Sequence, residues 1–282
     1  MKIDSIRAVV TGGAGGIGSA IAADLLARGA SVLLVDRDEA ALEASRSAFP
    51  AGREHADTLV ADLTDPAGRE QVRAAARSWR GGANVLINNA GINHFGLFES
   101  QTEAQIDAAI ALNVQVPIQL CRAMLPDLRQ REKAAVVNIG SVFGAIGYPG
   151  YVTYSATKFA LRGFTEALRR ELGGGSVSVH YLAPRATRTK INSSAVERMN
   201  QELGVAMDLP QRVAARVSSL LAADEPCAVV GWPEKIFVRI NGALPGLVDR
   251  AVRRQLDVIR RYAGAPPATA RLPVTNETRM PT

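Results

Sequence analysis

A glycine-rich segment near the N-terminus, residues 11–18 with the sequence TGGAGGIG, restricts the possible folds more than any other part of the chain. It follows an apolar run at residues 6–10 and precedes residues 19–28, whose apolar positions have helical spacing, so a strand, a tight turn and a helix are predicted. Glycines in such a turn permit positive φ angles and let the backbone approach a pyrophosphate, which the N–H groups of the helix N-terminus would bind. The next predicted strand ends on Asp36, where a ribose 2′-hydroxyl is expected, so the segment predicts a dinucleotide site.

Predicted strands and helices alternate along most of the 282 residues. The strands are predicted at residues 6–11, 31–36, 58–62, 85–88, 135–139 and 177–182. This alternation predicts an α/β fold with a doubly wound parallel sheet of the Rossmann type, in one catalytic domain over residues 1–231. Residues 232–264 are predicted to form a helical, basic C-terminal extension, and residues 265–282, which include four prolines, a disordered tail.

The segment at residues 154–158, YSATK, places a tyrosine and a lysine four positions apart in a predicted helix. Such positions share one helix face, so Lys158 is expected within reach of the Tyr154 ring, although a pair of this kind is also a common surface feature of helices. An unperturbed tyrosine has a pKa near ~10, which a neighbouring ammonium is expected to lower. Tyr154 is therefore predicted to be a catalytic acid, with Ser141 and Asn113 as polar neighbours.

These residues belong to a series of motifs that resembles the short-chain dehydrogenases/reductases in their single-domain form. The resemblance runs from Val9 to about Gly231 and rests on TGGAGGIG at 11–18, ADLT at 61–64, NNAG at 88–91, LNV at 112–114, IGS at 139–141 and YSATK at 154–158. It implies hydride transfer between a nicotinamide and a carbonyl or alcohol carbon. The catalytic residues that it implies are Asn113, Ser141, Tyr154 and Lys158.

The resemblance also implies a role for each matched position. Asn113 would hold a helix kink and a proton-relaying water, Ser141 would hydrogen-bond the substrate carbonyl, and Lys158 would also fix the nicotinamide ribose. Asp62 would bond the adenine edge, and the NNAG turn would line the adenosine ribose. The positions expected to contact the dinucleotide are Thr11, Gly12, Gly16, Ile17, Gly18, Asp36, Arg37, Asp62, Leu63, Asn89, Ala90, Gly91, Tyr154, Lys158, Pro184, Thr187 and Thr189.

NAD is the preferred cofactor on this reading, and NADP is possible. Asp36 can accept hydrogen bonds from a ribose 2′-hydroxyl but would repel a 2′-phosphate. Arg37 argues in the opposite direction, because a guanidinium beside the site can pair with a 2′-phosphate.

One position departs from the family pattern. Where the family usually has Pro-Gly after the sixth strand, this chain has Pro184-Arg185. If the glycine normally has a positive φ, Arg185 is strained there or the loop is reshaped. Arg185 and Arg188 either bind an anionic part of the substrate or are solvated loop residues. Residues 191–208, which follow, resemble the family's substrate lid.

The C-terminal extension carries most of the excess charge of the chain. Residues 232–282 contain nine Lys/Arg and four Asp/Glu, a net charge of +5, whereas the whole chain has +6. Apolar residues from Leu244 to Tyr262 recur with helical spacing and the arginines fall mainly on the other face, which predicts a basic amphipathic helix. Three purposes are open: contact with an anionic membrane surface, a cover over the active site, or a contact with a second subunit.

The remaining features limit the class of protein. The three histidines have no metal-ligand spacing, the two cysteines do not indicate disulfides, and the basic region lacks a nucleic-acid-binding motif. No leader or membrane-spanning run is recognised, so a cytoplasmic location, peripheral on a membrane at most, is expected. We therefore expect an NAD(P)-dependent oxidoreductase for an apolar, lipid-like ketone or secondary alcohol, in a homo-oligomer. A 3-oxoacyl-thioester reductase and a non-catalytic dinucleotide sensor are the alternatives.

Overall fold

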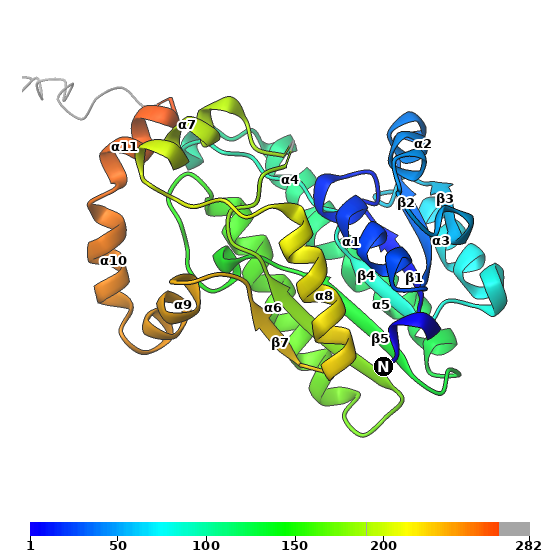
Figure 1. Ribbon diagram of the computed structural model, residues 1–282. Coiled ribbons are helices and arrows are strands. Elements are labelled where there is room, and N and C mark those ends of the chain that lie inside the picture. The colour runs from blue at the N-terminus through cyan, green and yellow to red at the C-terminus, as the bar shows by residue number, and fades with distance from the viewer. Residues whose placement is uncertain (190, 265–282) are drawn as a thin grey trace, which may run out of the picture.

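Seven parallel strands form a single sheet in the computed structural model, which describes residues 1–189 and 191–264 (Figure 1). Their order across the sheet is β3-β2-β1-β4-β5-β6-β7, so the chain starts in the middle and winds outward in both directions. The strands are β1 (Arg7–Thr11), β2 (Ser31–Asp36), β3 (Ala56–Val60), β4 (Val85–Asn88), β5 (Ala134–Ile139), β6 (Val177–Ala183) and β7 (Cys227–Val229). The chain winds away from β1 on one side and from β4 on the other, and this change in winding direction opens a crevice at the carboxyl ends of these two strands. Such a crevice is where α/β proteins bind ligands.

Helices cover both faces of this sheet. The helices are α1 (Gly16–Ala27), α2 (Glu39–Ser47), α3 (Pro66–Ser78), α4 (Glu103–Ile110), α5 (Val116–Leu128), α6 (Val152–Glu171), α7 (Ser194–Glu202) and α8 (Pro210–Ala223). Alternate residues of β1 point to opposite faces: Val10 packs with α1 and α8, whereas Val9 packs with α3 and α5. Each face therefore has its own apolar core, and the predicted doubly wound α/β fold is confirmed.

The predicted strand boundaries agree with the structure to within one residue except at the third strand, which runs over Ala56–Val60 instead of 58–62. The strand ends at Val60 because its last partner on β2 is Asp36. The Asp62 carboxylate then accepts bonds from the Thr64 N–H at 2.9 Å and the Thr64 hydroxyl at 2.7 Å, which turns the chain. Asp62 is thereby placed beyond the sheet edge, on the side where the cofactor is expected.

One continuous helical segment, Glu103–Leu128, is long and apolar enough by composition to cross a membrane, with a mean hydropathy of 1.3 over its most apolar stretch. No run of this length and composition was expected from the sequence. In the structure it comprises α4, a π-helical turn (Ala111–Gln115) and α5, and it connects β4 to the neighbouring parallel strand β5. It is the crossover of a βαβ unit, because α5 packs on the sheet through Leu120 and Met124.

The extension after β7 is helical, as predicted, but it forms three short helices instead of one amphipathic helix. They are α9 (Glu234–Ala243), α10 (Pro245–Arg253) and α11 (Leu256–Tyr262), which lie on one flank of the molecule with α11 against α7 (Figure 1). Pro245 begins α10. Proline has no backbone N–H, and this is no disadvantage in the first turn of a helix, where the N–H groups have no partner within the helix. Of the apolar stripe, Val248 and Ile259 are buried, whereas Leu244 and Leu247 are exposed. The disordered tail predicted at 265–282 lies outside the described residues.

Candidate active site

The glycine-rich turn between β1 and α1 has the conformation that its sequence predicts. Gly12 has a φ of +63°, and a Cβ on it would lie 2.9 Å from the Ala90 Cα. A Cβ on Gly18 would overlap the Gly12 carbonyl oxygen, so α1 can approach the turn only without a side chain there. The Asp36 carboxylate accepts a bond from the Ala14 N–H at 3.2 Å, which links the end of β2 to this turn. Arg37 follows on the exposed surface.

The turn is fastened to the loop that follows β4. The hydroxyl of Thr11, which is buried, accepts bonds from the N–H groups of Asn89 at 3.0 Å and Ala90 at 3.1 Å. The Asn89 amide donates in return to the carbonyl oxygens of Thr11 and Gly12. Thr11 and Asn89 thus hold two loops in register, and Leu63 near them is buried.

Asn113 lies in the π-helical turn between α4 and α5, which is the kink expected from the sequence. Its side-chain oxygen accepts from the Ile92 N–H at 2.9 Å, and its amide donates to the Ile92 carbonyl at 2.9 Å and to the Thr157 hydroxyl at 3.1 Å. π-Helical turns are rare in proteins, and those that occur are frequently at functional sites. This turn brings a buried amide from α4–α5 to the helix that carries Tyr154.

Tyr154 and Lys158 lie on one face of α6, as predicted, and the Lys158 Nζ is 5.6 Å from the centre of the Tyr154 ring. The Nζ donates to the Ile139 carbonyl at 3.0 Å. Burial lowers the pKa of Lys158 to about 8. The Ser141 hydroxyl, at the end of β5, accepts a bond from the Phe143 N–H at 3.1 Å.

The predicted direction of the Tyr154 pKa is wrong. Burial raises the pKa of the Tyr154 phenol to about 12, and the neighbouring Ser141 hydroxyl offsets only part of this rise. The reason is that desolvation penalises the phenolate more than the Ser141 hydrogen bond stabilises it, while the Lys158 ammonium is held at the Ile139 carbonyl. The phenol is therefore protonated at neutral pH, the state that an acid needs.

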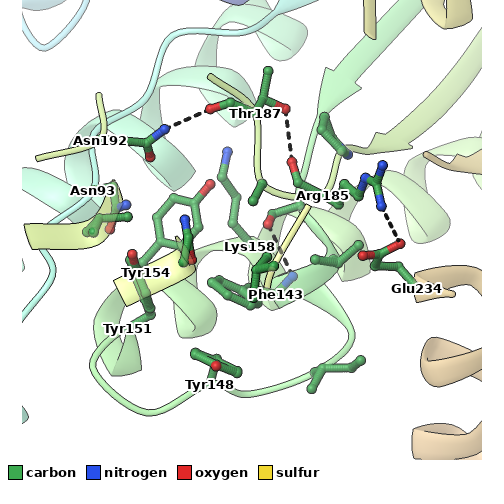
Figure 2. Close-up of a pocket in the computed structure, with 18 of the residues that line it drawn as sticks. Asn93, Phe143, Tyr148, Tyr151, Tyr154, Lys158, Arg185, Thr187, Asn192 and Glu234 are labelled. Atoms are coloured by element: carbon green, nitrogen blue, oxygen red, sulfur yellow. Dashed lines mark hydrogen bonds and ion pairs between the residues drawn. The ribbon is translucent and has the colours of Figure 1, made fainter. Parts of the chain in front are cut away.

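A cavity of about 360 Å³ opens beside these groups (Figure 2). The predicted site residues that line it are Ile17, Asn89, Gly91, Ser141, Tyr154, Lys158, Pro184, Thr187 and Thr189. The other predicted dinucleotide positions, Thr11, Gly12, Gly16, Gly18, Asp36, Arg37, Asp62, Leu63 and Ala90, and the catalytic Asn113 are not among the lining residues. Of these, Asn113 reaches the site indirectly, because its side-chain oxygen would lie 3.0 Å from a Cβ on Gly91.

Several lining residues were not predicted as site residues. Phe143 and Tyr148 stack at 4.9 Å between ring centres, next to Tyr151, and form an aromatic wall. The other unpredicted wall comes from the extension, and its members are Glu234, Phe237, Val248, Ala251, Val252 and Gln255. Of the three purposes open for the extension, the structure therefore shows a cover over the active-site cavity. The aromatic wall had no recognised signal in the sequence.

Neither side-chain role expected for Arg185, binding of an anionic substrate or a solvated position on the loop, agrees with the structure. Arg80 and Asp224 are the non-glycine residues with positive φ in the described part of the chain, so Arg185 is unstrained. Its guanidinium makes a two-pronged ion pair with Asp208, with bonds of 2.9 and 2.7 Å, which holds the pKa of that carboxyl below its usual range. Arg185 lines the cavity, but its guanidinium is occupied by Asp208 and is thus neither solvated nor free to bind an anionic substrate. The exposed Arg188 does not line the cavity.

The residues present fit a dinucleotide. Helix α1 begins at Gly16 with no side-chain cap and no acidic residue in its first turn, which leaves N–H groups and a positive dipole for a phosphate. Gly12 and Gly18 keep that approach free of side chains. Asp36 ends β2 and Asp62 follows the neighbouring strand β3, where the adenosine would lie, and Lys158 and Thr187 line the cavity, where the nicotinamide would lie. Within residues 1–189 and 191–264, no group of His, Cys, Asp and Glu could hold a metal ion.

Comparisons with known proteins agree with this geometry. A family model described as short chain dehydrogenase matches residues 7–200. The 3-oxoacyl-(acyl-carrier-protein) reductase FabG of Escherichia coli is 30% identical over 251 residues, which cover 86% of this chain and 99% of the relative. A short-chain dehydrogenase from Sphingobium yanoikuyae, in complex with NADPH, superimposes with a TM-score of 0.72 at 28% identity, over 86% of this chain and 95% of that one.

A further solved structure extends the likeness in fold. A short-chain dehydrogenase/reductase from Burkholderia phymatum, in complex with NAD, has a TM-score of 0.78 at 24% identity, over 88% of this chain and 96% of that one. The family match, the parallel sheet and the arrangement of the predicted motifs agree with one another. The chain therefore belongs to the short-chain dehydrogenase/reductase family and is an NAD(P)-dependent oxidoreductase.

Proposed function

We propose that the protein transfers hydride between a nicotinamide and an apolar ketone or secondary alcohol. The single observation that carries this proposal is the cavity itself, which joins Ser141, Tyr154 and Lys158 to a wall of apolar side chains. The apolar wall is contributed by α7, α9 and α10 through Val196, Met199, Phe237, Val248, Ala251 and Val252. A carbonyl would reach the polar groups while its hydrocarbon part leaves water for that wall.

The proton transfer follows from where charge develops. A bound nicotinamide supplies the hydride, and negative charge then builds on the carbonyl oxygen. Tyr154, with a pKa raised to about 12, is protonated at neutral pH and donates its proton to this oxygen, while the Ser141 hydroxyl stabilises it by a hydrogen bond. The Lys158 ammonium stabilises the phenolate that is left, and in the reverse direction Tyr154 is the base.

The route by which Tyr154 regains its proton can be inferred from the buried contacts. The Thr157 hydroxyl accepts a bond from the Asn113 amide at 3.1 Å and donates to the Tyr154 carbonyl at 2.7 Å. Asn113 also bonds the backbone at Ile92, so its side chain is fixed beside Gly91 and Lys158. We assign to Asn113 the positioning of a water that passes protons to Lys158.

NAD is the cofactor that we propose, with NADP as a second possibility. Asp36 is the last residue of β2, and its carboxylate accepts a bond from the Ala14 N–H of the phosphate turn, the side on which a 2′-phosphate would lie. Arg37 is exposed beside Asp36. The pKa of Asp62 is lowered mainly by its hydrogen bonds with Thr64 and to a smaller extent by the positive charge of Arg37. Its charge can therefore reach the adenosine side and permit some use of NADP.

The 3-oxoacyl-thioester reductase is the alternative substrate assignment. The identity with FabG supports it, because that relative's name specifies a 3-oxoacyl group. A non-catalytic dinucleotide sensor would keep the fold without turnover. Retention of both Tyr154 and Lys158 in one buried face argues against it.

Two surfaces support the partners expected from the sequence. Ile110 at the end of α4 and Phe159 on α6 are 40% and 44% exposed, and we propose that these helices contact a second copy of the chain.

The extension has three exposed apolar side chains among its arginines: Trp232, Leu244 and Leu247, which are 62%, 59% and 51% exposed. We propose that this side of the extension contacts anionic lipid. Light scattering of Phe159→Glu and vesicle co-sedimentation of Leu244→Glu test the two surfaces. An unchanged mass or unchanged anionic-vesicle binding would contradict the respective proposal.

A turnover screen tests the proposed reaction. Purified protein is incubated with NADH or NADPH and a panel of methyl ketones, cyclic ketones and a 3-oxoacyl thioester, and the fall in reduced cofactor is followed. Turnover of apolar ketones supports the proposal, whereas turnover confined to the thioester supports the alternative. Dinucleotide binding without turnover of any compound, in either direction, would favour the sensor.

A further inference from the structure

Arg185 joins the active-site loop to the first turn of the C-terminal extension. Its Nη1 lies 3.5 Å from the Glu234 carboxylate and donates to the Trp232 carbonyl at 3.2 Å (Figure 2). The chain packs so closely there that a Cβ on Gly231, which has a φ of +106°, would lie 2.7 Å from the Arg185 Cδ. The chain that leads into α9 thus packs closely against the Arg185 side chain.

The other side of Arg185 is anchored within the catalytic domain. Asp208, whose side chain is 4% exposed, accepts both prongs of the guanidinium. The Asp208 backbone is also bonded to the active-site loop, because its N–H donates to the Ala186 carbonyl at 2.8 Å and its carbonyl accepts from the Arg188 N–H at 2.9 Å. Arg185 therefore starts from a rigid base, and the group that it positions is the extension.

The later helices of the extension have attachments of their own. The Tyr148 hydroxyl donates to Gln255 at 2.7 Å, and the Tyr262 hydroxyl donates to Glu202 at 2.9 Å. Ile259 is fully buried against α7. Towards its far end, α9 is attached by a hydrogen bond from the Asn241 amide to the Ala145 carbonyl, at 2.8 Å. The first turn of α9, which precedes Phe237, depends on Arg185.

We propose that Arg185 is a positioning residue that fixes α9 as a wall of the substrate cavity and thereby sets the preference for ketones with a long apolar chain. The statement on substrate preference rests on the proposed function, whereas the statement on the position of α9 does not depend on it. Phe237, on α9, lines the cavity, and a wall of this kind strengthens binding by about fourfold for each methylene group that it removes from water. A short ketone held near Tyr154 gains little from it.

The test compares four variants of the full chain. Arg185→Met removes the joint, and Glu234→Gln weakens only its attachment to α9. Arg185→Met with Asp208→Asn removes the charge of the buried Asp208 carboxylate together with its main partner, in case the single variant does not fold. Arg212→Met is the matched control, because Arg212 pairs with the same Asp208 at 2.9 Å but does not line the cavity. Amide hydrogen exchange is measured in α9 and α11, and KM and kcat are measured for a short-chain and a long-chain methyl ketone.

In the first three variants we expect amide hydrogen exchange to be faster than in the parent protein in α9 but not in α11, and the increase should be smallest in Glu234→Gln. Arg212→Met should show no change. In the same three variants KM for the long-chain ketone should rise by roughly tenfold, the loss of one or two methylene contacts, with kcat and the short-chain KM little changed. Unchanged α9 exchange in all three variants would overturn the inference, and so would an equal rise of both KM values. If α9 loosens but the parent protein turns over no ketone, the proposed function fails while the role of Arg185 in placing α9 stands.

Discussion

The lowered pKa of Lys158 predicts a fall in carbonyl reduction above neutral pH. Burial lowers this pKa to about 8 from an ordinary value of 10.5, so the side chain is an ammonium below pH 8 and a neutral amine above it. With a pKa of about 8, about nine-tenths of the molecules carry the charge at pH 7 and about one-tenth at pH 9. Tyr154, with a pKa raised to about 12, stays protonated over the same range and does not limit the reaction. If reduction requires the ammonium, kcat/KM should fall about tenfold from pH 7 to pH 9.

The assay is kcat/KM for the reduced cofactor as a function of pH, at a saturating concentration of a ketone that the enzyme turns over. This ratio reports ionisations of the free enzyme, to which the pKa of Lys158 refers. Lys158→Met should have a low and flat profile over the same range, and Lys133→Met, which changes an exposed lysine, should keep the parent profile. A parent profile that is flat from pH 7 to pH 9, or a fall that persists in Lys158→Met, would refute the reasoning.

Two further predictions follow from the site. Tyr154→Phe should lower turnover by at least ~100-fold because the acid is lost, while dinucleotide affinity, measured by fluorescence titration, stays within a few-fold of the parent; near-parental turnover would show that Tyr154 is not the acid. Asp36→Ala should raise kcat/KM with NADP relative to NAD, because the repulsion of a 2′-phosphate is removed. A parent enzyme with a tenfold or greater advantage for NADP would contradict the role given to Asp36.

The sequence predicts the sheet and the cofactor turn well, because both depend on local rules. The apolar runs of β2 and β4 and the glycines at 12 and 18 each determine their own conformation within a few residues. The position of Lys158 one helical turn after Tyr154 is equally local. The pKa of Tyr154 is different, because it depends on how completely the fold buries the ring, and the expected direction was therefore wrong.

The ion pair between Arg185 and Asp208 could not be predicted from the same patterns. The two residues are 23 positions apart, and only the packing of the loop after β6 against the start of α8 brings them together. The sequence showed that an arginine replaces a glycine, which led to hypotheses of strain or anion binding. Arg185 has no positive φ, so its backbone is not strained, and its pairing with the buried Asp208 carboxylate leaves its guanidinium occupied. Its contact with Glu234 supports the role that we propose for it in holding the extension.

The extension shows why the substrate is harder to predict than the reaction. The family match ends at residue 200, whereas α9 and α10, which contribute an apolar wall of the cavity, begin at Glu234 and Pro245. Helical spacing identified an apolar stripe from Leu244 onward but could not show which members face inward, because α10 begins at Pro245 and leaves Leu244 and Leu247 exposed while Val248 is buried. The shared motifs thus encode the chemistry, whereas part of the wall that we propose to select the substrate is encoded in segments outside them.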